Sequence, residues 1–280
     1  MIHPKYTHKK LAFIGGGQMA SALAGGLLSA GWSSDELVVV EPNEAQRIKL
    51  QSSMGMRALS EPDKILADVE IVVWAVKPQV LEQAIGQAAP FLGQPPHISI
   101  AAGVRSEDIA AWTASRRVVR VMPNTAALVG SGVSAIAALD GVGTEDRALV
   151  ESIFSTTGYC FWVDTDDRLD AATAVSGSGP GYVFHFMEAF QSAAEALGFS
   201  TDEARNLVVR IVAGAVEQAK RDDTPFATLR QNVTSKRGTT EAALAVLDER
   251  NAAEALCAAV AAAHTRAAEL SQEYGRGSKV

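Results

Sequence analysis

Phe13-Ile14-Gly15-Gly16-Gly17-Gln18-Met19-Ala20 contains the pattern G-x-G-x-x-A, directly after an apolar run and directly before a helical pattern. In a dinucleotide-binding βαβ unit the first glycine permits a tight turn, and the second lets a pyrophosphate approach the backbone. The small third residue lets the helix pack closely on the strand. A purely structural glycine turn can have the same sequence pattern. The position of this pattern between a predicted strand and a predicted helix favours nucleotide binding. The expected cofactor contacts are Gly15, Gly17, Gln18, Met19 and Ala20.

Apolar runs typical of buried strands alternate with helical patterns through the first half of the chain. Strands are predicted at 11–14, 37–40, 71–76, 98–101, 118–122, 133–137 and 159–163, and helices at 18–30, 44–53, 79–89, 106–113 and 145–156. This alternation predicts a doubly wound parallel sheet of the Rossmann type. The charged run Asp164–Arg168 follows, and beyond it only helical spacing is found. We therefore expect a dinucleotide-binding domain at 1–164 and an all-α domain at 165–280.

The last predicted helix, 251–273, is dominated by alanine. Alanine has a high helix propensity but buries little area, so this helix needs a close-packed partner. Helices of a second subunit would supply one. The all-α domain is therefore predicted to hold two copies of the chain together as well as to contribute to the substrate site.

Composition limits the classes of protein to which the chain can belong. Its formal net charge of -7 argues against nucleic acid as a main partner, because phosphate binding needs clustered Lys and Arg. The uncharged run Leu11–Ser34 resembles a secretory signal, yet Gly15 interrupts its apolar part after four residues. We expect a cytoplasmic protein with no membrane span and no metal site. Cys160 and Cys257 are expected to be buried free thiols of a reducing compartment.

Glu41 ends the second predicted strand, 21 residues after Ala20. An acid at this place bonds the adenosine ribose hydroxyls of NAD, and a 2′-phosphate would meet a like charge there. Glu41 therefore favours NADH as the expected cofactor, although Arg47 of the next predicted helix could reach the 2′-phosphate of NADPH. The alternative interpretation of Glu41 is a solvated carboxylate at a strand end.

Open α/β sheets bind ligands in a crevice at the carboxyl ends of their strands, and further predicted strands are expected to end at this crevice. They provide the candidate cofactor contacts Ala75, Val76, Lys77, Pro78, Ala101, Gly103 and Asn124. Lys77 would bond the nicotinamide ribose or help to hold substrate, or else it is a plain surface lysine. Asn124 alternatively stabilises only its own turn.

Two segments in the second half place small residues and hydroxyls at helix starts, namely Ser176-Gly177-Ser178-Gly179-Pro180 and Thr234-Ser235-Lys236-Arg237-Gly238-Thr239-Thr240. Free backbone N–H groups at such positions bind anions, so a small carboxylate substrate is expected here. The first segment could instead kink a long helix, and Thr239 and Thr240 could be plain N-caps. A dinucleotide together with a small carboxylate indicates a reductase.

These motifs closely resemble those of pyrroline-5-carboxylate reductases. The resemblance runs from the glycine pattern to about Leu270 and rests on Ala75–Gln79, Met122–Thr125, Val175–Pro180, Val233–Ser235 and Gly238–Thr240. It implies reduction of the cyclic imine of 1-pyrroline-5-carboxylate to L-proline by NADPH or NADH, in a homodimer or larger homo-oligomer. It also implies that the Thr240 hydroxyl bonds the ring nitrogen. Hydroxyls and amides of Ser235, Gly238, Thr239 and Thr240 would hold the carboxylate, and Ser176 would line the pocket.

The chain departs from the family pattern at two places. Lys236-Arg237 stands where the family usually has Pro-Gly, and Ala126 stands where proline is usual. The first change puts two cations beside the expected carboxylate site. It also motivates the hypothesis of a cofactor-binding regulator without turnover. A related reductase acting on another cyclic imine is a further alternative.

Overall fold

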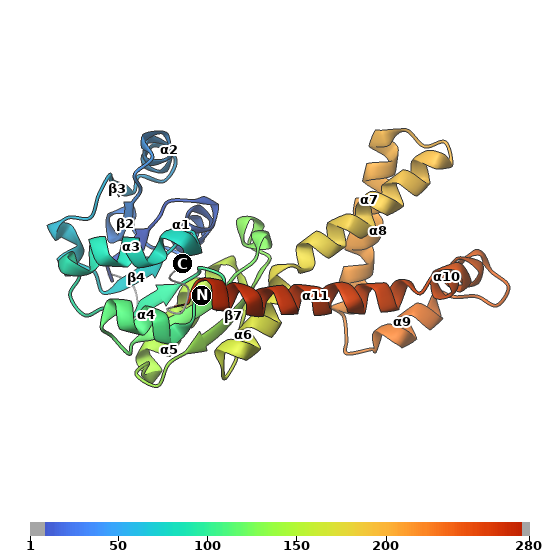
Figure 1. Cartoon of the computed structure of the whole chain (residues 1–280). Coiled ribbons are helices and arrows are strands. Elements are labelled where there is room, and N and C mark those ends of the chain that lie inside the picture. The colour runs from blue at the N-terminus through green and yellow to red at the C-terminus, as the bar shows by residue number, and fades with distance from the viewer. Residues whose placement is uncertain (1–8, 276–280) are drawn as a thin grey trace. The chain divides into compact units, whose positions relative to one another are not determined.

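A computed structural model describes residues 9–275 of the chain. The chain divides into two compact units. The first comprises the residues up to Ser178 together with those from Ala263, and the second comprises Gly179–Ala262. The last helix, α11 (Ala252–Glu273), begins in the second unit and ends in the first (Figure 1).

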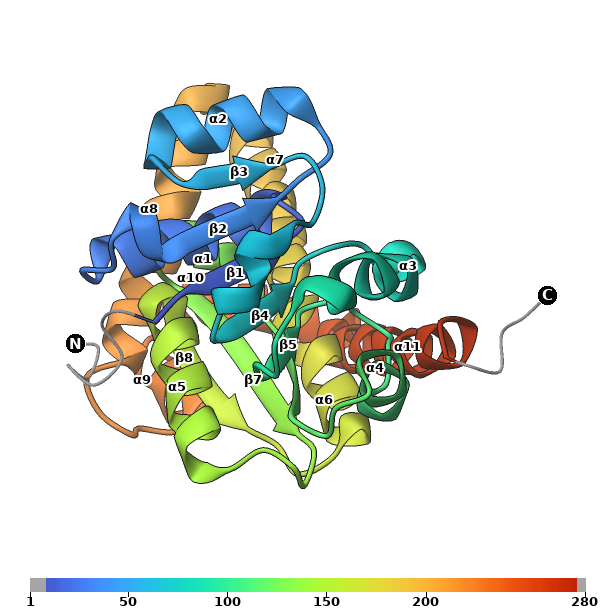
Figure 2. The ribbon, with the colours of Figure 1, turned by 90° about the vertical axis from the view of Figure 1, so that its left-hand side faces the viewer.

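The first unit is built on one eight-stranded sheet with the order β3-β2-β1-β4-β5-β6-β7-β8 (Figure 2). The strands are β1 (Leu11–Ile14), β2 (Leu37–Val40), β3 (Arg57–Leu59), β4 (Ile71–Trp74), β5 (His97–Ser99), β6 (Val118–Met122), β7 (Gly132–Ala138) and β8 (Gly158–Trp162). Neighbouring strands are parallel except for β6 and β7. The carboxyl ends of β1, β2 and β4 therefore meet at one edge, where the glycine turn lies.

Helices cover both faces of this sheet, and each face has its own apolar core. The helices of the first unit are α1 (Gln18–Ser29), α2 (Glu44–Met54), α3 (Pro78–Ala88), α4 (Ser106–Thr113), α5 (Thr144–Phe154) and α6 (Asp166–Ala172). Alternate residues of β1 point to opposite faces: Phe13 packs with α1, α2 and α5, whereas Ile14 packs with α3 and α4. The near-continuous apolar strands follow from this burial on both faces.

The sequence predicted seven of these strands, and the Rossmann-type fold is confirmed. The short strand β3 was not predicted, because Arg57-Ala58-Leu59 lacks an apolar run and its residues are only partly buried or exposed. The direction of β7 also differs from the expected parallel sheet. The link Pro123–Ser131 is too short for a parallel crossover, which needs about a dozen residues or more, so β7 returns antiparallel to β6.

The second unit is helical and leaves much apolar surface uncovered. It contains α7 (Gly179–Ala196), α8 (Thr201–Ala219), α9 (Phe226–Asn232), α10 (Thr239–Glu249) and the first part of α11. The helix α8 begins with a capping box, in which Ser200 and Glu203 bond each other's backbone N–H. Phe184, Phe186 and Phe190 on α7 are each about half exposed or more in the single chain.

The two cysteines differ in their surroundings. Cys160 is partly buried and Cys257 is exposed, so the expectation that both are buried is wrong for Cys257. Most residues of the first half of α11 are exposed in the single chain, Cys257 among them. Burial, with Glu151 nearby, raises the pKa of the Cys160 thiol to about 11. Within residues 9–275, no helix is long and apolar enough to cross a membrane.

His97 makes the first unit sensitive to acid. It is 4% exposed on β5, and its ring stacks on the Trp74 indole with 5.9 Å between centroids. Burial, together with the nearby Arg117, lowers the pKa of His97 to about 4, so the native state holds a neutral ring. An unfolded histidine takes up its proton near pH 6.5, so stability from this residue is full above that pH and is lost towards pH 4.

We expect His97 to account for about 2 to 3 kcal/mol of the stability lost between pH 7 and pH 4.5. Thermal unfolding of the wild type and of His97→Phe, which keeps a stacking ring without a proton site, measures this share. The fall in Tm on acidification should be clearly smaller for His97→Phe. Equal falls in both proteins would show that other groups carry the acid sensitivity.

Candidate active site

The glycine turn joins the carboxyl ends of three strands. The Gly15 N–H donates to the Val40 carbonyl at 2.8 Å, and the Ala75 N–H donates to the Ile14 carbonyl at 2.8 Å. Gly15 has φ +100°, and a Cβ built on it would lie 2.6 Å from the Ala75 oxygen. Only glycine combines this conformation with this close approach. The turn therefore brings β1 against β4 and opens directly into α1.

Gly17 provides the space and the donors that a pyrophosphate needs. It is the N-cap of α1 and is exposed, and a Cβ built on it would meet nothing within 4 Å. No side chain caps α1 and no acid lies in its first turn. The first N–H groups of the helix thus face open space with the positive end of the helix dipole behind them, which fits the diphosphate of a dinucleotide.

A pocket of about 490 Å³ lies beside this turn. Of the predicted cofactor contacts it is lined by Gly15, Gly17, Glu41, Ala75, Val76 and Lys77. Lys77 is the exposed N-cap of α3, and Pro78 is the first residue of that helix. The structure therefore brings together the glycine turn and the ends of β2 and β4.

The remaining predicted contacts lie outside the lining of this pocket. Gln18 and Met19 begin α1, where Gln18 is exposed, and Ala20 is buried in the core beneath the glycine turn. Ala101 is buried after β5. Gly103, with φ +74°, lies against Leu270 of α11, 2.8 Å from where its Cβ would be. The roles of these residues towards a cofactor stay predictions.

The pocket also includes residues that the sequence analysis missed. They are Ser60, Glu61 and Pro62 after β3, and Val80, Gln83, Ala84 and Gln87 on α3. The spacing of the α3 set, i, i+3, i+4 and i+7, marks one face of a helix and could have been found from the start of α3 at Pro78. The loop after β3 gave no such signal, because β3 itself has no apolar run.

Glu41 and Arg47 are both held by backbone groups at the end of β2. The Glu41 carboxylate accepts from the Gly16 N–H and from the Asn43 N–H, each at 2.8 Å. The Arg47 guanidinium donates to the Glu41 carbonyl at 2.8 Å and to the Pro42 carbonyl at 2.7 Å. Arg47 does not line the pocket, whereas Glu41 does.

Asn124 connects the end of β6 to the segment that carries Ser176. Its side-chain N–H donates to the Ser176 carbonyl at 2.9 Å, and its side-chain oxygen accepts from the Val133 N–H at 3.2 Å. Ser176 lies in a π-helical segment, Thr173–Gly177, and its hydroxyl donates to the Ala172 carbonyl. Asn124 thus stabilises more than its own turn, and such π segments are frequent at functional sites.

A buried ion-pair cluster joins β6 to α6, the helix that directly precedes this π-helical segment. Arg120 on β6 is 1% exposed, 3.0 Å from Asp166 and 3.5 Å from Asp170 of α6. The Ser271 hydroxyl of α11 donates to Asp170 at 3.0 Å. Burial by itself would raise the pKa of Asp166, but Arg120 and the bonds from Ser106 hold it below its ordinary value. The lowered pKa favours the charged form of Asp166, and the ion pairs of Arg120 fix α6 to the sheet.

In the second unit, Thr239 and Thr240 are the first two residues of α10. Gly238 is the N-cap, with φ −89° and ψ 174°, and no side chain caps the helix, so neither threonine acts as an N-cap here. The Gly238 N–H is already bonded to the Ser235 carbonyl at 2.9 Å. Among the described residues, the N–H groups of Thr239 and Thr240 have no acceptor outside the helix. The N-terminus of α10 thus retains backbone N–H groups that are free to bind a ligand.

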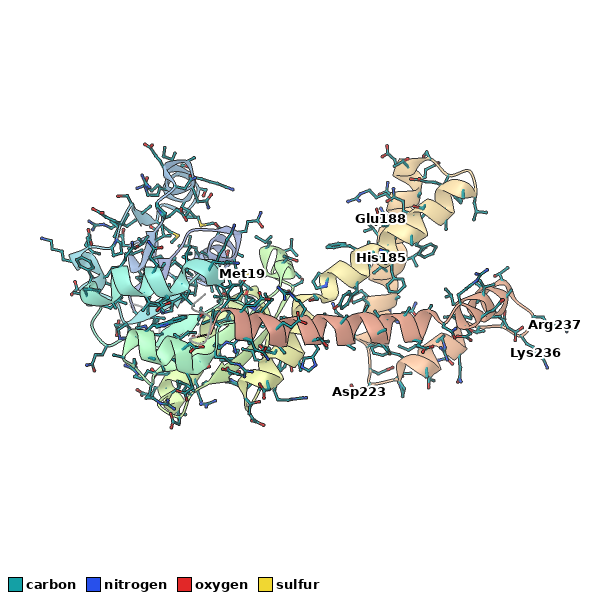
Figure 3. All side chains as sticks on the ribbon, in the orientation of Figure 1. Met19, His185, Glu188, Asp223, Lys236 and Arg237 are labelled. Atoms are coloured by element: carbon teal, nitrogen blue, oxygen red, sulfur yellow. The ribbon has the colours of Figure 1, made fainter. Side chains whose placement is uncertain are left out.

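The two cations of this turn are solvent-exposed. Lys236 and Arg237 project outward from the turn before α10 (Figure 3). Arg237 has φ +60°, the left-handed conformation that glycine adopts most easily. The backbone N–H of Arg237 donates to the Glu241 carboxylate at 2.6 Å. Arginine thus adopts the left-handed conformation here, and the turn before the free N–H groups of α10 carries two positive charges.

Two family models match the chain, one in each half. Residues 10–103 match the family model for coenzyme F420-dependent NADP oxidoreductase, and residues 166–270 match the model for pyrroline-5-carboxylate reductase dimerisation. The chain is 37% identical to pyrroline-5-carboxylate reductase of Pseudomonas aeruginosa over 95% of its own length and 98% of that protein. The chain belongs to the pyrroline-5-carboxylate reductase family.

Solved structures of this family have the same fold. A pyrroline-5-carboxylate reductase from Coxiella burnetii is 35% identical, with a TM-score of 0.87 and coverage of 94% of this chain and 98% of that one. A pyrroline carboxylate reductase from Plasmodium falciparum, solved with NADP bound, is 30% identical, with a TM-score of 0.85 and the same coverage. The family resemblance seen in the motifs is thereby confirmed over 94% of this chain.

Proposed function

We propose that this chain reduces the cyclic imine of 1-pyrroline-5-carboxylate to L-proline with NADPH or NADH, the last step of proline biosynthesis. The observation that carries the proposal is full-length membership of the reductase family, combined with a glycine turn whose α1 N–H groups are free. The bound nicotinamide would supply the hydride. Gly15 and Gly17 would admit the diphosphate, and Lys77 would stand at the wall of the same pocket.

Thr240 is the residue that we assign to the imine. Hydride attack on a C=N bond is easier when the nitrogen is hydrogen-bonded, so a hydroxyl donor is enough to orient and polarise it. The Thr240 hydroxyl has no hydrogen-bond partner in the described part of the chain and lies half-buried at the second position of α10. The N–H groups of Thr239 and Thr240, with the Ser235 hydroxyl, would hold the carboxylate.

The second unit is proposed to form a homodimer. Its α7 and α8 enclose a groove of about 740 Å³ that Phe184, Met187 and Val209 line together with polar residues. Phe184 is 64% exposed in the single chain, and large apolar surfaces of this kind mark protein interfaces. The family model matched over 166–270 describes dimerisation. Sedimentation of the purified protein tests the assembly, and a monomer at micromolar concentration would contradict it.

The reaction is tested by following the absorbance of the reduced nicotinamide after pyrroline-5-carboxylate is added to purified protein. Rapid oxidation with proline formed in equal amount is expected. A six-membered cyclic imino acid is assayed in parallel, and faster turnover of that compound would favour the related imine reductase. Nucleotide binding without turnover of either compound would instead favour the regulator, for which the Lys236-Arg237 change is the motivation.

The two cations before α10 are expected to strengthen binding of the anionic substrate. We predict that the double change Lys236→Gln/Arg237→Gln raises KM for pyrroline-5-carboxylate about three- to tenfold, leaves kcat within twofold, and makes KM less dependent on salt. Arg250→Gln, at the opposite end of α10, removes one exposed charge without touching the turn and is the matched control. An unchanged KM in the double variant would mean that both cations only face solvent.

A further inference from the structure

The part of the pocket formed by the ends of β2 and β3 is acidic. Three charged residues line the pocket: Glu41 after β2, Glu61 after β3 and Lys77 at the start of α3. Glu61 is exposed and has no ion-pair partner within the described residues. Both acids come from the ends of neighbouring strands, β2 and β3, whereas Lys77 belongs to the end of β4. A ligand group placed at the end of β2 would therefore meet two carboxylates.

Glu41 is held in one orientation. One of its oxygens accepts from the Gly16 N–H and the other from the Asn43 N–H, so the side chain is fixed between the glycine turn and the start of α2. Each carboxylate oxygen keeps a further lone pair for another donor. A ribose with free 2′ and 3′ hydroxyls can supply such a donor. A 2′-phosphate offers only acceptors and negative charge, so it cannot replace that bond.

Arg47, near the end of β2, is held by backbone groups and does not form part of the pocket wall. The Arg47 guanidinium donates to the carbonyls of Glu41 and Pro42, at 2.8 Å and 2.7 Å, and does not contribute to the pocket wall. In this position the Nη1 of Arg47 is bonded to both carbonyls. A site made for a phosphate would instead present the guanidinium fork to the ligand.

We propose that this chain selects NADH over NADPH, with Glu41 and Glu61 as the residues that discriminate. The inference rests on the proposed function only for the use of a nicotinamide cofactor. The Plasmodium falciparum relative was solved with NADP bound, and the proposed selectivity concerns the pocket of this chain alone. Glu41 favours the free ribose through a hydrogen bond, and the two carboxylates together repel the phosphate.

The proposal is tested by direct binding. The dissociation constants of NADH and NADPH are measured by fluorescence titration without substrate, so the result does not depend on turnover. The wild type should bind NADH at least tenfold more tightly than NADPH. Glu41→Gln should reduce this ratio about tenfold and Glu61→Gln about threefold, each mainly by tighter NADPH binding. The matched control is Glu82→Gln, on α3 outside the pocket, which should leave the ratio unchanged.

Arg47→Gln separates the two interpretations of that residue. If Arg47 only supports the backbone after β2, its replacement weakens both cofactors alike and leaves the ratio within twofold. A loss confined to NADPH would show that Arg47 binds the phosphate, and it would overturn the proposal. Equal wild-type affinities would overturn it as well. Glu61 makes no bond to the glycine turn, so Glu61→Gln remains informative even if Glu41→Gln fails to fold.

Failure of the selectivity proposal is distinguishable from failure of the proposed function. Tight binding of either cofactor without imine reduction would contradict the reductase assignment alone. Reduction of pyrroline-5-carboxylate with both cofactors bound equally would contradict the selectivity alone.

Discussion

Thr240→Ala is expected to lower kcat/KM for pyrroline-5-carboxylate about 10²–10³-fold, which is typical of the loss of one donor aimed at a reacting polar bond. The hydroxyl would polarise the imine, and the N-cap of α10, Gly238, has no side-chain hydroxyl that could replace it. The affinity for NADH should stay within twofold, because the cofactor would be held by the first unit. Steady-state kinetics and cofactor titration on the same preparation measure both.

Two controls separate this chemistry from a structural effect. Thr240→Ser keeps the hydroxyl and should retain kcat/KM within about tenfold of the wild type. Because Thr240 caps nothing, Thr240→Ala should leave the free energy of unfolding within about 0.5 kcal/mol of the wild type. If kcat/KM of Thr240→Ala stays within twofold of the wild type, the assignment of Thr240 to the imine nitrogen is wrong.

Gly15→Ala is expected to abolish measurable cofactor binding and to lower Tm by several degrees. The new Cβ would lie 2.6 Å from the oxygen of Ala75 and 2.9 Å from Cγ1 of Val76, at a φ of +100° that L residues rarely adopt. The end of β4 would have to move, and it forms the wall of the pocket. Titration with NADH and thermal unfolding are the two measurements.

Gly17→Ala should behave differently, although it changes the same motif. Gly17 has φ −66° and open space around its Cα, so alanine fits and Tm should stay within about 2 °C. The added methyl group would project to where the diphosphate is proposed to lie, and the NADH dissociation constant should rise at least tenfold. Gly86→Ala on α3 is the matched control, with open space and no pocket contact. Unchanged affinity in Gly17→Ala would remove Gly17 from the diphosphate site.

Local patterns were sufficient for most of the first unit. The runs at 11–14, 37–40 and 118–122 form strands with those same bounds, because strands buried on both faces are continuous apolar segments bounded by turns. The capping box at Ser200 and Glu203 is also a local feature, because its bonds join residues three positions apart. The motif resemblance then led to the family, which the full-length relatives confirm.

Only the tertiary structure decided the properties that depend on distant segments. Neither the pairing of β3 with β2 nor the return of β7 beside β6 leaves a periodic trace in the sequence. The bond from Asn124 to Ser176 spans 52 positions, and the contact between Gly103 and Leu270 spans still more. Glu41 and Arg47 are close in sequence, yet their roles follow from which backbone groups the fold brings to each. The apolar pattern of a helix or strand repeats every few residues, so it can be read from a short stretch of sequence. The orientation of a side chain in a pocket depends instead on chain segments that meet only after folding.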